Sequence, residues 1–304
     1  MSTNHSGRTR QRNGIAIGEG AIRKIFPAFV VLMWITTFFW VKNGQWTSFN
    51  TVLAIEATVI CAIVFVNFVY VFNFGYAAAL FVLNLTIIIT QGHCLGAVII
   101  GGLLMIYAIR LFIFVWQRYQ AESFAPRKQG TQMAHKALPT PIKIALFVQT
   151  STLMTFHAMT TYNISQHAKT EGTNGVSGWL IIGALILAQG LVIEALADSQ
   201  KQKAKKLNGS TWVESGLFAK TRHPNYLGEI LVQAGLIISG FGTGNHWYIY
   251  AAGILSPLYI IILMLSATTG GELLKQQKYG EDPQYRAYMR RSNPLLPRLR
   301  KTLI

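Results

Sequence analysis

The chain has 304 residues, of which 51% are hydrophobic and only 12% are charged, and its formal net charge is +16. An average soluble domain carries about 25% charged residues, so the composition argues against a soluble protein and predicts an all-α, polytopic membrane helical bundle. Two cysteines, Cys61 and Cys94, are too few for a disulfide framework or a cysteine zinc site. The scattered histidines have no metal-ligand spacing, so no metal site is expected.

Apolar runs near the length of about 20 residues that crosses a bilayer as a helix recur along the chain. They predict about eight transmembrane helices, at residues 25–41, 51–72, 76–90, 94–116, 143–162, 178–197, 225–241 and 246–266. Only two or three residues join the second span to the third and the third to the fourth. These pairs are therefore expected to form tight antiparallel hairpins.

The runs divide the chain into four parts. Residues 1–24 form a polar, basic tail, and residues 25–116 form an N-terminal half of four spans. Residues 117–142, with two prolines and a glycine, are expected to be a cytoplasmic loop. Residues 143–304 form a C-terminal half of four spans that ends in an amphipathic tail. The first apolar run lacks a signal-peptide cleavage pattern, so we expect it to be retained.

The distribution of lysine and arginine predicts the orientation. With the N-terminus inside, the inner segments hold 24 of the 27 basic residues and the outer segments hold 2. This asymmetry follows the positive-inside rule and predicts that both termini are cytoplasmic. The positive charge is thereby explained by orientation and by anionic lipid, so membrane lipids are the expected partners and nucleic acid is not. A multi-pass protein of the plasma (inner) membrane or the endoplasmic reticulum is expected.

The sixth span ends in the sequence LVIEALADSQKQKAKK. Glu194, Asp198, Lys201 and Lys205 are spaced by 4, 3 and 4 residues, so they share one stripe of a continuing helix. The lysines are typical of side chains that reach out to the membrane surface. Glu194 lies inside the apolar run, where an exposed carboxylate would face lipid, so we expect it to line a polar site.

The seventh span opens with the sequence KTRHPNYLGE. Its proline suits the first turn of a helix, and Gly228 allows a second backbone or a ligand to approach closely. Contacts between helices are the alternative explanation of this polar stripe. The side chains expected to face the same site as Glu194 are Arg222, His223, Asn225, Tyr226 and Glu229.

In the C-terminal tail, basic residues alternate with tyrosines over residues 275–291. The Glu281-Asp282-Pro283 sequence predicts the start of a helix, which we expect to be short, amphipathic and placed against the membrane. Tyr285 and Arg290 suit stacking on an adenine and pairing with a phosphate. Binding to a lipid surface explains the same residues equally well.

Polar residues also interrupt the spans before residue 178. Glu56 and Asn67 lie in the second span, and His157 lies in the fifth. Tyr107 and Arg110 lie three residues apart in the fourth span, so their side chains share one face. Glu56 and Arg110 carry charge inside apolar runs, which makes both candidates for a chemical role.

Three segments of the C-terminal half resemble the steroid 5-alpha-reductase family, in particular its bacterial-type membrane members. They are EALADSQK at 194–201, GLFAKTRHPNYLGE at 216–229 and KYGEDPQYRAY at 278–288. The resemblance covers roughly residues 95–300. The RHP-x-Tyr-x-Gly pattern by itself is also similar to the isoprenylcysteine carboxyl methyltransferases. The resemblance implies a multi-span helical fold that holds NADPH from the cytosolic side without a Rossmann domain.

The resemblance also implies roles for individual residues. In that family a catalytic tyrosine precedes an arginine by three residues, as Tyr107 precedes Arg110. The catalytic glutamate lies in an earlier helix, and Glu56 is the candidate here, although its surroundings depart from the family's motif. Positions that match cofactor contacts are Asp198, Asn225, Tyr226 and Glu229. Glu194 stands where steroid reductases have an amide. The residue patterns add further cofactor-binding candidates, which are Glu194, Lys201, Arg222, His223, Tyr285 and Arg290.

The function expected from these features is an NADPH-dependent reductase of lipid metabolism. It would reduce a carbon–carbon double bond of a lipid-like, steroid or enone-type substrate that enters from the bilayer. A membrane methyltransferase that uses S-adenosylmethionine on a lipid or prenylated substrate is the alternative. A third possibility is a non-enzymatic membrane protein that uses the same fold as a binding module.

Overall fold

The computed structural model describes residues 26–91, 94–244 and 246–297, so the basic tail at residues 1–24 lies outside the described residues. Every secondary-structure element in this part of the chain is a helix. The only β-type pairing among the described residues is an isolated bridge between Thr221 and Asn293. The all-α prediction is therefore confirmed.

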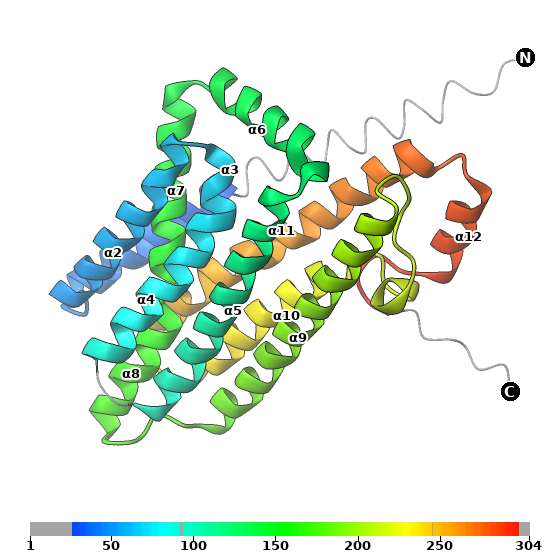
Figure 1. Ribbon diagram of the computed structural model, residues 1–304. Coiled ribbons are helices and arrows are strands. Elements are labelled where there is room, and N and C mark those ends of the chain that lie inside the picture. Colours follow the sequence, from blue (N-terminus) through cyan, green and yellow to red (C-terminus); the bar gives the residue numbers. More distant parts are fainter. Residues whose placement is uncertain (1–25, 92–93, 245, 298–304) are drawn as a thin grey trace, which may run out of the picture.

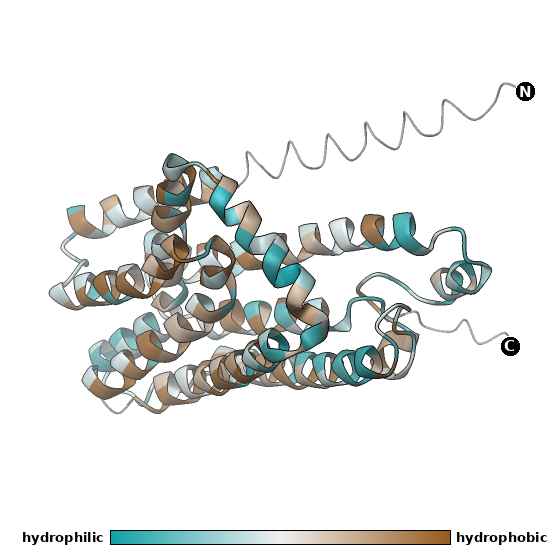
Figure 2. Cartoon of the chain, turned by 45° about the horizontal axis from the view of Figure 1, so that its top comes forward, coloured by the Kyte–Doolittle hydropathy of each residue, from teal (hydrophilic) through white to brown (hydrophobic). Residues whose placement is uncertain are grey.

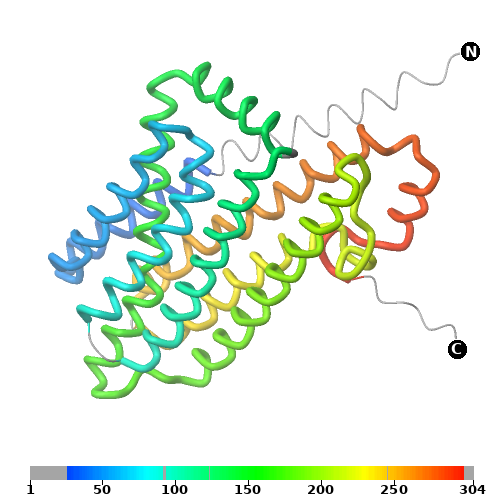
Figure 3. Tube along the Cα trace, in the orientation of Figure 1, coloured from blue at the N-terminus to red at the C-terminus, as the bar shows by residue number. Residues whose placement is uncertain are grey.

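The chain runs back and forth through a bundle of side-by-side helices (Figure 1, Figure 3). Its elements in order are the helical segment Phe26–Lys42, α2 (Ser48–Cys61, with a 3-10 turn Ala62–Phe65), α3 (Phe68–Tyr70), a π-helical turn (Val71–Gly75), α4 (Tyr76–Thr90), α5 (Leu95–Gln120), α6 (Ala125–Ala137), α7 (Thr140–His157), α8 (Met159–Glu171), α9 (Gly178–Leu207), α10 (Pro224–Ser239), α11 (Trp247–Tyr279) and α12 (Pro283–Arg291).

Within the described residues, five helices are long and apolar enough to cross a membrane, fewer than the eight spans expected. They are Ser48–Phe65, Phe68–Thr90, Leu95–Gln120, Gly178–Leu207 and Trp247–Tyr279. The other three expected spans are also helical, but each is short or interrupted. Phe26–Lys42 is a shorter apolar helix, α7 and α8 are separated at Ala158, and α10 has 16 residues. The prediction of a polytopic membrane protein is confirmed.

The first hairpin turn lies earlier than the sequence predicted. The chain turns at Val66 and Asn67 rather than at residues 73–75, and Asn67 accepts a hydrogen bond from the Val69 N–H at 3.0 Å. An asparagine in this position caps a helix by satisfying an otherwise unpaired N–H. Asn67 is therefore a cap in a turn and not a polar residue inside a span, whereas residues 71–75 continue the helix as one π turn.

The expected cytoplasmic loop at residues 117–142 is mostly helical. α5 continues to Gln120, and α6 occupies Ala125–Ala137 with Pro126 in its first turn. α6 is a polar helix with no buried residue, and hydrophilic colouring gathers along it and along the C-terminal end of α9 (Figure 2). The proline predicted to interrupt helical structure begins a helix instead, because a missing N–H is harmless in a first turn.

α9 and α10 are in direct backbone contact. A Cβ added to Gly190 would lie 2.6 Å from the Gly228 carbonyl oxygen, and one added to Gly228 would lie 2.6 Å from the Glu194 Cβ. Small residues allow membrane helices to approach this closely. The expectation that Gly228 admits a second backbone is confirmed, and this contact brings Glu194 next to the α10 face that carries Glu229.

Substituting Gly190 with alanine is expected to destabilise the bundle by forcing α9 and α10 apart. Overpacking a close contact costs about 1–3 kcal/mol, so the Gly190→Ala protein should show a lower midpoint of thermal unfolding in detergent. Gly102→Ala is the matched control, because a Cβ at Gly102 in α5 would meet nothing within 4 Å. Equal midpoints for the two variants would contradict the close helix contact.

Candidate functional site

A buried polar cluster lies where α4, α5, α7, α9 and α10 meet. Its members are polar or charged side chains inside an otherwise apolar bundle, and hydrogen bonds connect all of them. We call the following residues the carboxylate cluster: Tyr76, Tyr107, Arg110, His157, Glu194, Asp198, Glu229 and Gln233.

Tyr107 of α5 lies at the centre of the carboxylate cluster. Its side chain is fully buried, and its hydroxyl donates a hydrogen bond to Oε2 of Glu229. The same hydroxyl lies 3.4 Å from Oε1 of Glu194. The phenol is thus held between two carboxylates from neighbouring helices, and each can accept its proton.

Arg110, one helical turn after Tyr107, joins the carboxylates of α9. Its Nη1 lies 3.0 Å from Glu194 Oε1, and its Nη2 lies 2.9 Å from Asp198 Oδ2. Both carboxylates are buried, so the guanidinium compensates for part of the cost of removing them from water. The predicted stripe of Glu194 and Asp198 is therefore confirmed as one face of α9, and it faces the pair Tyr107 and Arg110.

On the other side of Tyr107, an amide and a second tyrosine hold Glu229. Gln233 Nε2 donates to Glu229 Oε1 at 2.8 Å and to the Tyr76 hydroxyl at 2.9 Å, and that hydroxyl donates to the same Oε1 at 3.1 Å. Gln233 Oε1 then accepts from Nε2 of His157 at 3.0 Å. Tyr76 directly follows the π turn, a feature that often re-aims side chains at functional sites.

The carboxylate cluster contains more acid than base. Glu194, Asp198 and Glu229 are buried beside one guanidinium, and within the described residues Oε2 of Glu194 has no hydrogen-bond partner. A buried charge without compensation is costly. The arrangement therefore favours a shared proton or a bound group that donates hydrogen bonds or carries positive charge.

A group of basic residues lies near the first turn of α10. The charges of Arg118 and Arg127 act on the Tyr226 phenol, and those of Arg118 and Lys201 act on the Asp198 carboxyl. None of these three basic side chains forms an ion pair with any residue that the structure describes. We call Arg118, Arg127 and Lys201 the basic group; Asn225 is half-buried in the same turn of α10 as Tyr226.

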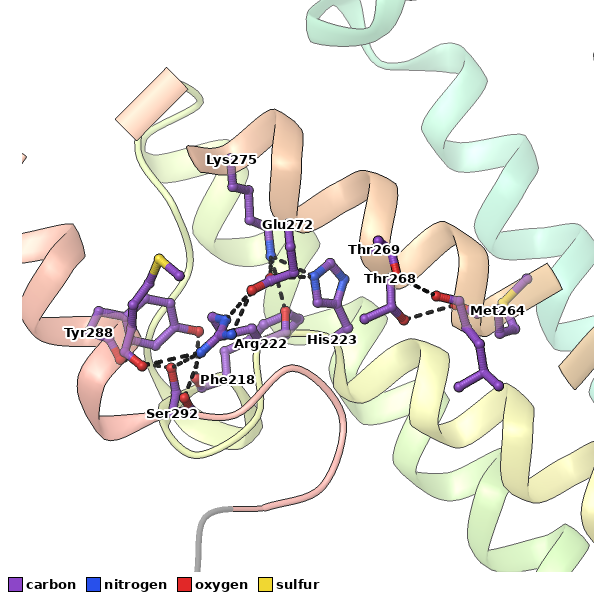
Figure 4. A network of polar contacts seen from close by, with 12 residues as sticks. Phe218, Arg222, His223, Met264, Thr268, Thr269, Glu272, Lys275, Tyr288 and Ser292 are labelled. Carbon is purple, nitrogen blue, oxygen red and sulfur yellow. Dashed lines mark hydrogen bonds and ion pairs between the residues drawn. The ribbon is translucent and has the colours of Figure 1, made fainter. Parts of the chain in front are cut away.

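Arg222 of the sequence RHP has a different environment, inside a junction of three segments (Figure 4). Its side chain is buried, lies 2.6 Å from Oε2 of Glu272 in α11, and donates from Nη1 to the Ser292 carbonyl oxygen at 2.5 Å. Its backbone N–H donates to the Asn293 carbonyl oxygen at 2.8 Å. Arg222 thus fastens the start of α10 to α11 and to the end of α12.

His223 belongs to the same junction. Its Nε2 lies 2.8 Å from Oε1 of Glu272 and 3.2 Å from Nζ of Lys275, and its ring stacks on Tyr226 at 5.1 Å. Burial lowers the pKa of His223 below its ordinary value, and the bond to Glu272 opposes that effect. The histidine is therefore neutral at neutral pH and contributes hydrogen bonds rather than charge.

The C-terminal tail forms the expected short helix. Asp282 caps α12 by accepting from the Gln284 N–H at 2.7 Å, which confirms the predicted start. Tyr285 is fully buried against Trp212, with ring centroids 5.2 Å apart, and burial raises its pKa to about 12. Arg290 is exposed. Tyr285 therefore packs inside the protein, where no open face is left for stacking on an adenine.

Glu56, the expected catalytic carboxylate, lies outside the carboxylate cluster. It accepts a hydrogen bond from the Thr86 hydroxyl at 3.0 Å, and no hydrogen bond joins it to Tyr107 in the described part of the chain. The carboxylates that contact Tyr107 come instead from α9 and α10. The structure therefore separates the two residues expected to be catalytic.

Sequence reasoning missed two members of the carboxylate cluster, Tyr76 and Gln233. Gln233 follows Glu229 by four residues, so the helical spacing that selected Glu229 also contained the signal for Gln233. Tyr76 lay at the expected beginning of a span, where a tyrosine is an ordinary interface residue. The π turn that directs it inward has no sequence signal that we could identify.

Comparison with protein families gives one match. The model of the family described as "Protein of unknown function (DUF1295)" matches residues 62–292, which is more than half of the chain. The matched segment contains every member of the carboxylate cluster. Neither the search of curated proteins nor the search of solved structures found a match.

Replacing Arg222 with lysine is expected to loosen α12. Lysine keeps the charge, but it cannot bond Glu272 and Ser292 at once in the geometry of a guanidinium. Amide hydrogen exchange in α12 should become at least about tenfold faster, which is roughly 1.4 kcal/mol of local stability.

Arg290→Lys is the matched control for this measurement, because Arg290 is exposed on the same helix and forms no hydrogen bond or ion pair within the part of the chain that the structure describes. Substitutions of such surface residues change stability little, so exchange in α12 should stay unchanged. Unchanged exchange in Arg222→Lys as well would show that the junction does not hold α12 in place.

Proposed function

We propose that this chain, which belongs to the DUF1295 family, is an integral membrane reductase that uses NADPH to reduce a carbon–carbon double bond of a lipid-like substrate. The observation that carries the proposal is the buried Tyr107 hydroxyl between Glu229 and Glu194. The resemblance of three C-terminal segments to the steroid 5-alpha-reductase family supports the same chemistry. The position of the carboxylate cluster among membrane-spanning helices suits a lipophilic substrate.

Reduction of an activated double bond adds a hydride to one carbon and a proton to the other. When bound, NADPH supplies the hydride and leaves as NADP⁺. Tyr107 is the group that would donate the proton, or a hydrogen bond to a developing enolate oxygen, because it holds the hydroxyl of the cluster nearest to both carboxylates. Glu229 and Glu194 lie in position to return a proton to the phenolate, so the tyrosine can act again.

The residues present fit the two ends of NADPH. The basic group offers three side chains without a carboxylate ion pair among the described residues, as the phosphates require. Oε2 of Glu194 is buried without a partner in the described chain and can accept from the nicotinamide carboxamide. The Arg222 guanidinium already binds Glu272 and the Ser292 carbonyl oxygen. It would therefore aid cofactor binding only indirectly, by holding the start of α10 in place.

One observation favours a second candidate, the S-adenosylmethionine-dependent methyltransferase. Three buried carboxylates next to one guanidinium are a suitable environment for a sulfonium cation. The two ligands place opposite demands on the site. The dinucleotide needs the basic group, whereas the sulfonium needs the excess negative charge of the carboxylate cluster.

Thermal unfolding of the purified protein in detergent, with NADPH, NADH and S-adenosylmethionine side by side, tests the proposal. A ligand at a hundredfold excess over its Kd stabilises the folded state by about 2.7 kcal/mol, so NADPH should raise the unfolding midpoint clearly. Arg127→Ala should reduce that rise at low salt. Added salt should narrow the difference between the variant and the unchanged protein, because Arg127 is exposed and its charge is screened.

Arg286→Ala serves as the control, since Arg286 of α12 pairs with Glu281 in the turn before that helix and lies outside the basic group. It should leave the response to NADPH unchanged. A rise with S-adenosylmethionine alone would reject the reductase and select the methyltransferase, and no rise with any of the three would reject both.

A further inference from the structure

We infer that the groove between α5 and α9 is the site at which the lipid substrate binds from the bilayer, with its polar head on Arg110. The groove has a volume of about 450 Å³, which lies in the range of small-molecule sites. Its walls are formed mainly by Ile106, Ile109, Ile113 and Phe114 of α5 and by Ala195 of α9. Calling the lipid the substrate rests on the proposed function, whereas lipid binding in the groove does not.

The position of the groove identifies bilayer lipid as its occupant. α5 and α9 are both among the helices long and apolar enough to span a membrane. The isoleucines of the wall are about half exposed, with 56% for Ile106, 48% for Ile109 and 49% for Ile113. Apolar side chains on the outer face of membrane-spanning helices contact lipid, so the groove opens to hydrocarbon.

The polar groups of the groove are arranged for an amphiphile. Arg110 and Asp198 form part of its lining. Gln117 lines it about two turns after Arg110 on α5, and Ser199 and Gln202 line it within about one turn after Asp198 on α9. Ile106 lies about one turn before Arg110 on α5, on the side away from Gln117. A hydrocarbon chain can therefore run along the isoleucines while a polar head lies beside Arg110.

The charges of Arg110, Glu194 and Asp198 determine which polar head group of a lipid the groove can bind. A guanidinium has five N–H donors, and the hydrogen bonds of Arg110 to Glu194 and Asp198 use two of them. Donors thus remain for a carbonyl or hydroxyl oxygen in the groove. The two carboxylates already neutralise the guanidinium, so a carboxylate or phosphate head would meet net negative charge. The groove is suited to a lipid whose polar head is uncharged.

The same geometry connects the groove to the carboxylate cluster. Oε1 of Glu194 lies 3.0 Å from Nη1 of Arg110 and 3.4 Å from the Tyr107 hydroxyl. Glu194 therefore links Arg110, which lines the groove, to Tyr107, the proposed proton donor, through one carboxylate oxygen. A second groove of about 280 Å³, lined by Trp34, Thr152 and Phe156 among others, has no charged residue in its lining.

Photolabelling of the purified protein tests the groove. The probes are a sterol with a diazirine on its hydrocarbon part and a free hydroxyl, and a fatty acid with a diazirine and a free carboxylate. Mass spectrometry of peptides should place the sterol label on α5 and α9, with much weaker labelling by the fatty acid. Ile109→Trp fills the groove and should lower the sterol label about tenfold.

Ile55→Trp is the matched control, because Ile55 is 58% exposed on α2 and lies outside the groove lining. It should leave the sterol label unchanged. Label near Trp34, no label at all, equal labelling by the fatty acid, or an Ile109→Trp protein that labels normally would each overturn the inference.

The unfolding assay with NADPH separates this inference from the proposed function. Ile109→Trp should keep the full response to NADPH, which also shows that the variant is folded. A groove that labels in a protein without a response to NADPH would leave the lipid site standing and remove the reductase.

Discussion

The burial of three carboxylates beside a single guanidinium is the constraint on which the rest of the structure depends. Glu194, Asp198 and Glu229 lie among membrane-spanning helices, where an uncompensated charge is costly. Arg110 balances part of that charge, and the hydroxyls of Tyr107 and Tyr76 supply further donors. The remaining imbalance requires a shared proton or a ligand, and both are properties of a chemical site.

The helix packing follows from the need to bring these groups together. Without side chains at Gly190 and Gly228, the backbones of α9 and α10 come into contact, and the two glutamates share one space. At the start of α10, the junction of Arg222 with Glu272 and Ser292 fixes α10 against α11 and α12. The RHP sequence therefore positions the helix that carries Glu229, and the carboxylate cluster lies one turn further into the bundle.

The sequence was sufficient to predict the fold class and to single out most members of the carboxylate cluster, all except Tyr76 and Gln233. Spacing placed Glu194 and Asp198 on one face, paired Tyr107 with Arg110, and located the helix start at Asp282. Spacing within one helix cannot show which helices meet, so Glu56 was selected as the catalytic acid although the structure places it against Thr86.

The other differences between the sequence-based predictions and the structure also arise from features that local sequence does not show. Arg222 is a cofactor-binding candidate by sequence, because the residues next to it give no sign of the distant Glu272 and Ser292 that surround it in the structure. The turn expected at residues 73–75 lies at Asn67 instead, because a π turn continues the helix through residues 71–75. No local sequence pattern indicates that π turn.

The most direct test of the central claim is infrared spectroscopy of the carboxyl groups, because it detects the shared proton without a substrate. The account predicts a carbonyl band of a protonated carboxylic acid at neutral pH, which shifts on addition of NADPH and in Tyr107→Phe and is lost in Glu194→Gln combined with Glu229→Gln. A spectrum without such a band, or a band that the double substitution leaves in place, would contradict the account.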